Sequence, residues 1–97
     1  MASRITIYGN PAHKDVRRLQ REMNVMYVEY SLTDPRKDTR AARRLQSELT
    51  EESIPLPVVE VLREDDQGSL YLTNPDAATL RQSLYSEGIL SITSYWL

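Results

Sequence analysis

The sequence predicts an α/β domain with strands and helices in the order β-α-β-α-β-β-α. Two observations carry this prediction. Short runs of alternating or β-branched apolar residues alternate with segments of helical apolar period, and a polar loop separates the last two runs. A chain of 97 residues fits one domain with a core of modest size. We place that domain at residues 1–90 and treat residues 91–97 as a C-terminal extension.

The first half of the chain is expected to fold as strand, helix, strand, helix. Residues 4–8 alternate, with Ile5 and Ile7 on one side of a strand. In the helix that follows, the apolar stripe recurs at i, i+3 and i+7 and consists of Val16, Leu19 and Met23. Residues 26–32 form the second expected strand. The inward residues of the second helix are Ala41, Ala42, Leu45 and Leu49.

The second half is expected to fold as a hairpin followed by a helix. Residues 57–62 and 69–72 are the strands, and the polar residues 64–68 join them. The third helix has Ala77, Leu80 and Leu84 inward, and Gly88 is placed to end it. Two βαβ-like steps give a parallel start and the hairpin adds antiparallel strands. The result is a mixed sheet with helices on both faces.

An Asn-Pro or Asp-Pro pair follows three of the strands and indicates where the helices begin. The Asx side chain caps free N–H groups, and proline at the first helical position loses no hydrogen bond. We therefore expect Asp34 and Asn74 to be N-caps. After Asn10 the helix can instead start two or three residues later, and Pro11 then shapes the loop.

Composition excludes several classes of function. The chain has no cysteine, so it forms no disulfide, exchanges no thiols of its own and holds no thiolate-bound metal. No apolar segment approaches membrane-spanning length, and none follows Met1 as in a signal peptide. We expect a cytoplasmic protein without a membrane partner. Charge is uneven, because residues 1–50 hold ten Lys and Arg against six Asp and Glu, and residues 51–97 hold two against eight.

The second predicted helix carries a basic strip. Nucleic-acid binding normally requires stacking aromatic residues or a known reader motif beside such a strip, and neither accompanies it here. A solvated charged face is the favoured interpretation, so we expect no nucleic-acid partner. The strip consists of Arg36, Lys37, Arg40, Arg43 and Arg44.

Four segments, in their joint order, resemble glutaredoxins of the mycoredoxin-like type. Residues 5–11, Ile-Thr-Ile-Tyr-Gly-Asn-Pro, look like the first strand and loop of that family. Residues 13–20, His-Lys-Asp-Val-Arg-Arg-Leu-Gln, are similar to its segment that begins Cys-x-x-Cys and continues Arg-Arg-Leu-Lys. Residues 33–35, Thr-Asp-Pro, resemble the start of its second helix, and residues 54–59, Ile-Pro-Leu-Pro-Val-Val, match its aliphatic-Pro-x-Val motif.

The resemblance covers about residues 4–88 and implies a thioredoxin-like, glutaredoxin-type fold. That fold has a four-stranded mixed sheet of order 2-1-3-4, with strand four antiparallel to strand three, flanked by three main helices. It also implies a ligand site at the loop and at Leu56-Pro57, whose peptide bond is the candidate for the family's cis-proline. There the backbone groups of the residue before the proline stay free to pair with an extended ligand.

The two cysteine positions of the family hold His13 and Val16 in this chain. Without a thiolate, neither the dithiol nor the monothiol mechanism can operate. Of the family's glutathione contacts, Asp76 is the one that can still face a ligand, and it can equally sit in the first turn of the third helix. The expected ligand-binding residues are Tyr8, His13, Lys14, Asp15, Leu56, Pro57 and Asp76.

His13, the only histidine, stands near a helix N-terminus, where the helix dipole disfavours the imidazolium. It is a weak candidate for a general base or a hydrogen-bond donor, because no partner for a triad is visible and a polar residue left at a lost cysteine is the plainer interpretation. A ligand carboxylate could bind beside Lys14 at the helix start, although Asp15 can satisfy those N–H groups itself. No spacing of His, Cys and carboxylates predicts a metal site.

The C-terminal residues Tyr95, Trp96 and Leu97 would prefer burial. They can fold back on the domain or serve as an exposed anchor for a partner or a second copy.

The leading functional hypothesis is a redox-inactive binding module for an extended peptide or a small thiol-type ligand. Glutathione is the candidate small ligand, and no other cofactor is expected. Two alternatives stay open. One is a non-thiol enzyme with a residual glutathione-type pocket that uses His13 or Tyr8, and the other is an interaction subunit that acts through its C-terminal tail.

Overall fold

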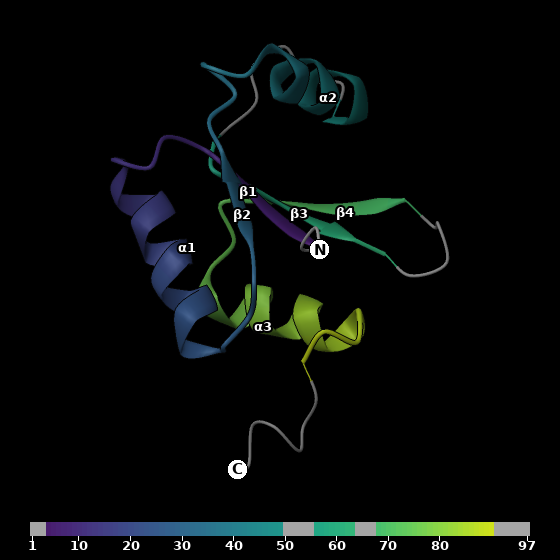
Figure 1. Cartoon of the computed structure of the whole chain (residues 1–97). Coiled ribbons are helices and arrows are strands. Elements are labelled where there is room, and N and C mark those ends of the chain that lie inside the picture. The colour runs from purple at the N-terminus through teal and green to yellow at the C-terminus, as the bar shows by residue number, and fades with distance from the viewer. Residues whose placement is uncertain (1–3, 50–55, 64–67, 91–97) are drawn as a thin grey trace.

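The computed structural model describes residues 4–49, 56–63 and 68–90 and has the predicted element order (Figure 1). The strands are β1 (Ile5–Tyr8), β2 (Ser31–Thr33), β3 (Val58–Leu62) and β4 (Ser69–Thr73). The helices are α1 (Lys14–Val25), α2 (Thr39–Leu49) and α3 (Ala77–Ser86). The second strand is shorter than expected, because residues 28 and 30 reach the core from a loop.

The strands form one mixed sheet of order β2-β1-β3-β4. β1 and β2 are parallel, whereas β3 is antiparallel to both β1 and β4. Two parallel βαβ units were expected, and only the first, β1-α1-β2, is present. The second is absent because β3, which follows α2, runs antiparallel to β1. The order, the antiparallel β3–β4 pair and the three helices agree with the predicted architecture and are compatible with a thioredoxin-like fold.

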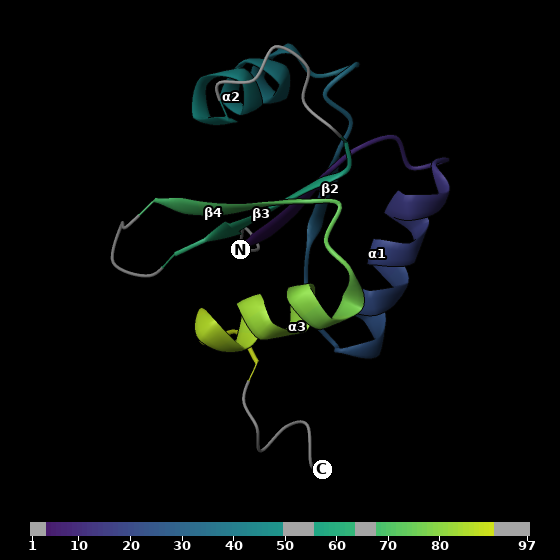
Figure 2. The same cartoon turned by 180° about the vertical axis from the view of Figure 1, so that it is seen from behind.

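The two faces of the sheet are covered unequally (Figures 1 and 2). α1 and α3 lie on one face and enclose the main apolar core, and α2 lies alone on the other face. The main core consists of Ile5, Ile7, Val16, Leu19, Met23, Val59, Val61, Leu80 and Leu84. The buried residues of the α2 cluster are Tyr8, Ala41, Leu45 and Val58. The predicted stripe of α1 is confirmed, and in the other two helices Ala42, Leu49 and Ala77 are only half-buried.

The helix starts differ from the predicted ones by a few residues. The side chains that cap the first free N–H groups belong to His13, Asp38 and Asp76. The expected N-caps Asp34 and Asn74 are therefore wrong. Asp34 accepts a hydrogen bond within a preceding turn, and Asn74 has a positive φ of 38° and accepts from Arg18. The later start of α1 leaves Pro11 in the loop, as the alternative interpretation held.

Two helices end in the same hydrogen-bonded motif, with a left-handed residue just past the last turn. At the end of α3 this residue is Gly88, with φ 73°, as predicted. At the end of α1 it is Tyr27, with φ 55° and a side chain that is 95% exposed. In both motifs the next N–H reaches back to the helix, from Ile89 to Leu84 and from Val28 to Met23.

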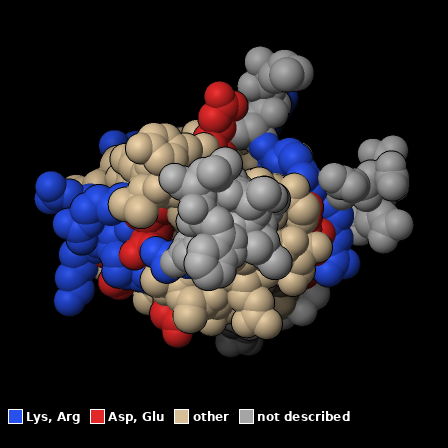
Figure 3. All heavy atoms as spheres, turned by 90° about the horizontal axis from the view of Figure 1, so that it is seen from below, with Lys and Arg blue, Asp and Glu red and all other residues tan. Residues whose placement is uncertain are grey.

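Lys and Arg side chains gather beside α1 on the face of the molecule that is seen from below (Figure 3). Figure 3 shows Lys and Arg over the α1 side of the molecule, where Lys14, Arg17 and Arg21 are exposed. None of the helices in the described ranges combines the length and the apolar character needed to cross a membrane.

Candidate functional site

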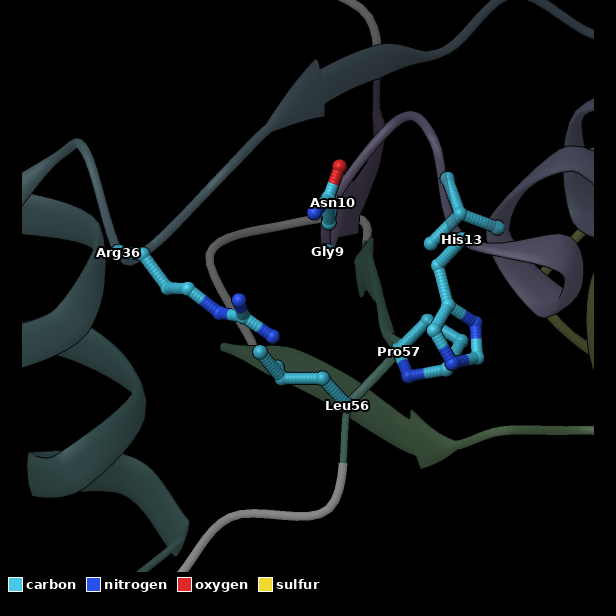
Figure 4. Close-up of a pocket in the computed structure, with 7 residues that line it drawn as sticks. Gly9, Asn10, His13, Arg36, Leu56 and Pro57 are labelled. Carbon is cyan, nitrogen blue, oxygen red and sulfur yellow. The ribbon is translucent and has the colours of Figure 1, made fainter.

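A pocket of about 250 Å³ opens at the edge of the sheet where β1 and β2 end and β3 begins (Figure 4). It brings together three of the predicted ligand-binding residues, His13, Leu56 and Pro57. The remaining wall comes from two residues of the β1–α1 loop, one residue of α1 and one arginine that precedes α2. The lining residues are Gly9, Asn10, His13, Val16, Arg36, Leu56 and Pro57.

The loop after β1 approaches the rest of the pocket closely at Gly9. The Gly9 N–H donates to the carbonyl oxygen of Thr33 at 2.9 Å, which extends the β1–β2 pairing by one residue. A Cβ atom on Gly9 would lie 2.6 Å from Cγ2 of Val16 and 3.3 Å from Cβ of Pro57. The floor of the pocket therefore has no room for a side chain at this position.

His13 stands at the N-cap of α1 and faces the pocket. Its Nδ1 atom accepts a hydrogen bond from the Asp15 N–H at 3.2 Å. Because Nδ1 is the acceptor, the ring hydrogen of the neutral imidazole is on Nε2. Asp15 Oδ2 lies 3.8 Å from the same nitrogen, and the His13 side chain is 48% exposed. His13 can thus offer a ligand one N–H donor, while its other nitrogen is engaged in the helix cap.

Arg36 reaches into the pocket from the side opposite His13 (Figure 4). It belongs to the turn between β2 and α2, and its own N–H donates to Asp34 Oδ1 at 3.0 Å. Within the described ranges, no carboxylate forms an ion pair with its guanidinium. A guanidinium facing an imidazole N–H suits an anionic group of a ligand.

Arg36 was interpreted as part of a solvated basic strip, so its position at the pocket was not predicted. The feature that could have indicated this position is that Arg36 follows closely after the second predicted strand. β1 and β2 are parallel, so the segments that follow them meet at one edge of the sheet.

Leu56 and Pro57 supply the third side of the pocket, and the bond between them is cis. The carbonyl oxygen of Pro57 accepts from the Asn74 N–H at 2.7 Å. Neither the N–H nor the carbonyl of Leu56 is hydrogen-bonded to another described residue. With respect to the described residues, Leu56 therefore keeps one backbone donor and one backbone acceptor with which an extended chain could pair.

The other predicted site residues lie outside this pocket. Tyr8 is on the opposite, α2-covered face of the sheet, because it alternates with the inward Ile7. Lys14 is exposed at the start of α1, and the backbone N–H of Asp15 donates to the capping side chain of His13. Asp76 caps α3 by accepting from the Thr79 N–H at 2.7 Å, and this hydrogen bond lowers the pKa of Asp76. The predicted anchor at residues 95–97 lies outside the described residues.

A second polar cluster, which the sequence analysis missed, surrounds Glu60 on the α2 face. Glu60 is 3% exposed, and the hydroxyl of Tyr8 donates to its Oε1 at 2.5 Å. Its Oε2 accepts from Arg44 Nη2 and Ser69 Oγ, both at 2.6 Å, and from the Tyr71 hydroxyl at 3.2 Å. The available signal was a glutamate within the run Val58–Leu62, since a carboxylate in a buried strand requires donors.

The partners of Glu60 fix the protonation states in this cluster. Burial alone would raise the pKa of Glu60, but hydrogen bonds from Ser69, Tyr8 and Arg44, with the charge of Arg44, outweigh it and lower the pKa. Burial raises the pKa of Tyr8, and the hydrogen bond and the negative charge of Glu60 raise it further. These shifts keep Glu60 ionised and Tyr8 protonated at neutral pH, so that Tyr8 acts as a hydrogen-bond donor to Glu60.

No group of three or more His, Cys, Asp and Glu side chains that could hold a metal ion occurs within residues 4–49, 56–63 and 68–90. Comparison of the chain with protein-family models and with curated proteins gives no match. The functional conclusion therefore depends on the geometry of the pocket.

Proposed function

We propose that the chain is a glutaredoxin-like binding module without redox activity. Its ligand is an extended peptide or a small thiol-type molecule that carries an acidic group. The observation that carries the proposal is the convergence of three features in one pocket. These are the backbone N–H and carbonyl of Leu56, which bond to no other described residue, the guanidinium of Arg36 and the Nε2–H of His13.

Each feature has a distinct part in the proposed binding mode. Leu56 pairs with the ligand backbone as a neighbouring strand would, which gives affinity without dependence on side chains. Arg36 receives a carboxylate in a bidentate geometry, and His13 donates to a second ligand oxygen. The pocket volume of about 250 Å³ is just below the usual range for small-molecule pockets, so the pocket accommodates one or two residues of a peptide.

Binding without covalent chemistry is favoured by what lines the pocket. None of the 7 described residues that line it carries a hydroxyl, a thiol or a carboxylate. His13 Nδ1 accepts the Asp15 N–H, so the neutral ring carries its hydrogen on Nε2 and offers the pocket a donor and not a base. The proposal includes the cytoplasmic location expected from the sequence, and a chain without cysteine is indifferent to the redox state of its compartment.

A titration followed by ¹H–¹⁵N NMR tests the proposal with three probes. These are glutathione, an extended tetrapeptide with a free C-terminal carboxylate, and the same tetrapeptide as its C-terminal amide. We expect amide shifts confined to residues 9–16, 36 and 56–58. Absence of shifts there with all three probes would overturn the proposal, and concentration-dependent shifts confined to Trp96 would favour an interaction subunit instead.

The arginine is tested by Arg36→Met, with Arg43→Met as the matched control. Arg43 is exposed on α2 and does not line the pocket. Loss of a charge-assisted hydrogen bond should weaken binding of the carboxylate peptide by about tenfold or more and leave the amide peptide nearly unchanged. Equal losses for both peptides would contradict the assigned role of Arg36.

A further inference from the structure

We propose that the Arg44–Glu60 ion pair positions the pocket: it fixes α2 on the sheet and thereby holds Arg36 in place. Arg44 and Glu60 do not line the pocket, so they are positioning residues. The predicted effect on ligand affinity rests on the proposed function, whereas the predicted effect on Arg36 itself does not.

The apolar attachment of α2 is small. Ala41 and Leu45 are the buried residues that α2 contributes to its side of the sheet, and Leu49 is only half-buried. α2 lies alone on that face in both views, whereas α1 and α3 share the larger core on the opposite face (Figures 1 and 2). A helix with so little buried apolar surface gains much of its fixed position from directional contacts.

Arg44 supplies such a contact from the middle of α2. Its Nη2 atom lies 2.6 Å from Oε2 of Glu60 on β3. The carboxylate is itself immobilised by donors from β1 and β4, namely Tyr8, Ser69 and Tyr71. Arg44 thus forms its ion pair with a buried carboxylate that other donors hold in place, and not with a mobile surface carboxylate. The pair therefore determines the position of α2 on the sheet.

The segment between Arg36 and α2 transmits this position to the pocket. The carbonyl oxygen of Asp34 accepts from the N–H groups of residues 37 and 38, both at 3.0 Å, and its Oδ1 accepts from the Arg36 N–H. Asp38 Oδ1 in turn accepts from the N–H groups of residues 40 and 41. The turn and the helix therefore form one hydrogen-bonded unit, and a displacement of α2 displaces Arg36 with it.

The experiment compares Arg44→Met, Arg44→Lys and Arg43→Met in the full chain without ligand. Methionine keeps an apolar stem but removes the charge, and lysine restores the charge. We expect Arg44→Met to shift the Arg36 amide signal and to speed hydrogen exchange across residues 39–49 by about tenfold or more. In the Arg44→Lys variant, the Arg36 signal and the exchange rates should lie close to those of the wild type. Arg43→Met should change neither quantity.

Unchanged Arg36 shifts and unchanged exchange in folded Arg44→Met would overturn the proposal. If Arg44→Met fails to fold, Glu60→Gln replaces it, since this variant keeps the shape of the side chain and removes the anion. Glu60→Gln must then show the same changes at Arg36, and their absence would equally overturn the proposal.

Peptide binding separates positioning from a general loss of stability. Arg44→Met should reduce the preference for the carboxylate tetrapeptide over its amide, as Arg36→Met does, whereas destabilisation alone would weaken both peptides alike. If neither peptide binds the wild-type chain, the proposed function fails. The exchange and shift measurements still decide whether Arg44 positions Arg36.

Discussion

The hydroxyl of Tyr8 donates a hydrogen bond to Oε1 of Glu60 at 2.5 Å, between the adjacent antiparallel strands β1 and β3. Glu60 pairs directly with Thr6, so Tyr8 reaches it along the diagonal of the strand pair. The phenol that lies next to the pocket loop in the sequence therefore serves the opposite face of the sheet.

Replacing Tyr8 with Phe tests this assignment. The substitution removes one donor to a buried carboxylate that keeps three others, so the free energy of unfolding should fall by about 1–2 kcal/mol in urea denaturation. Ligand shifts at residues 9–16 should stay as in the wild type. Loss of those shifts in a folded Tyr8→Phe protein would mean that Tyr8 belongs to the pocket after all.

The low pKa of Glu60 predicts a specific loss of stability in acid. A carboxyl group whose pKa is lower in the folded chain than in the unfolded chain stabilises the fold above its unfolded value, which is about 4.3. That contribution disappears as the pH falls through the folded-state value. Unfolding free energies measured from pH 7 to pH 2 should therefore decline more steeply for the wild type than for Glu60→Gln. Parallel curves would show that other carboxylates dominate.

Tyr27 is expected to lower the free energy of unfolding, because its backbone is in the left-handed region. A tyrosine in the left-handed region costs about 1–2 kcal/mol relative to a residue without Cβ, and the exposed side chain returns little through packing. Because glycine also loses more backbone entropy on folding, Tyr27→Gly should stabilise the fold by a net of about 0.5–1 kcal/mol in thermal or urea denaturation. Tyr27→Ala, which removes the ring but keeps Cβ, should not. Equal effects of the two variants would assign the gain to loss of the ring.

Gly9→Ala should disturb the floor of the pocket. The new methyl group would collide with Val16 at 2.6 Å, and both residues are buried, so we expect a loss of about 1–3 kcal/mol. Adding Val16→Ala removes the colliding Cγ2 atom. The double variant should therefore lose less stability than the sum of the two single variants, measured by urea denaturation. Simple additivity would contradict the close approach.

The periodic parts of the sequence predicted the fold well. The stripe of Val16, Leu19 and Met23, the alternation around Ile5 and Ile7, and the ending of α3 at Gly88 all appear in the structure. Such features depend on neighbours close in sequence, where helical or strand period fixes which side chains share a face. The pocket residues His13, Leu56 and Pro57 came from the resemblance, and the structure places them together.

The remaining features depend on contacts between distant segments. Arg36 meets the pocket only because β2 lies beside β1, and Glu60 is satisfied only because three other elements deliver donors to it. The predicted N-cap at Asn74 is wrong for a related reason, because its side chain accepts a hydrogen bond from Arg18, 56 positions earlier in the chain. Local capping preference cannot anticipate such a competitor.

Glu60 also restricts how β3 can pair. The flanking residues Val59 and Val61 face the main apolar core, and Glu60 faces the donors under α2. A slip of one residue in pairing would turn the carboxylate toward the buried Ile5 and Ile7, where it would meet only hydrocarbon. Burying an uncompensated charge there is far more costly than misplacing a valine. One glutamate thus discriminates against mispaired sheets during folding and commits β3 to a single register.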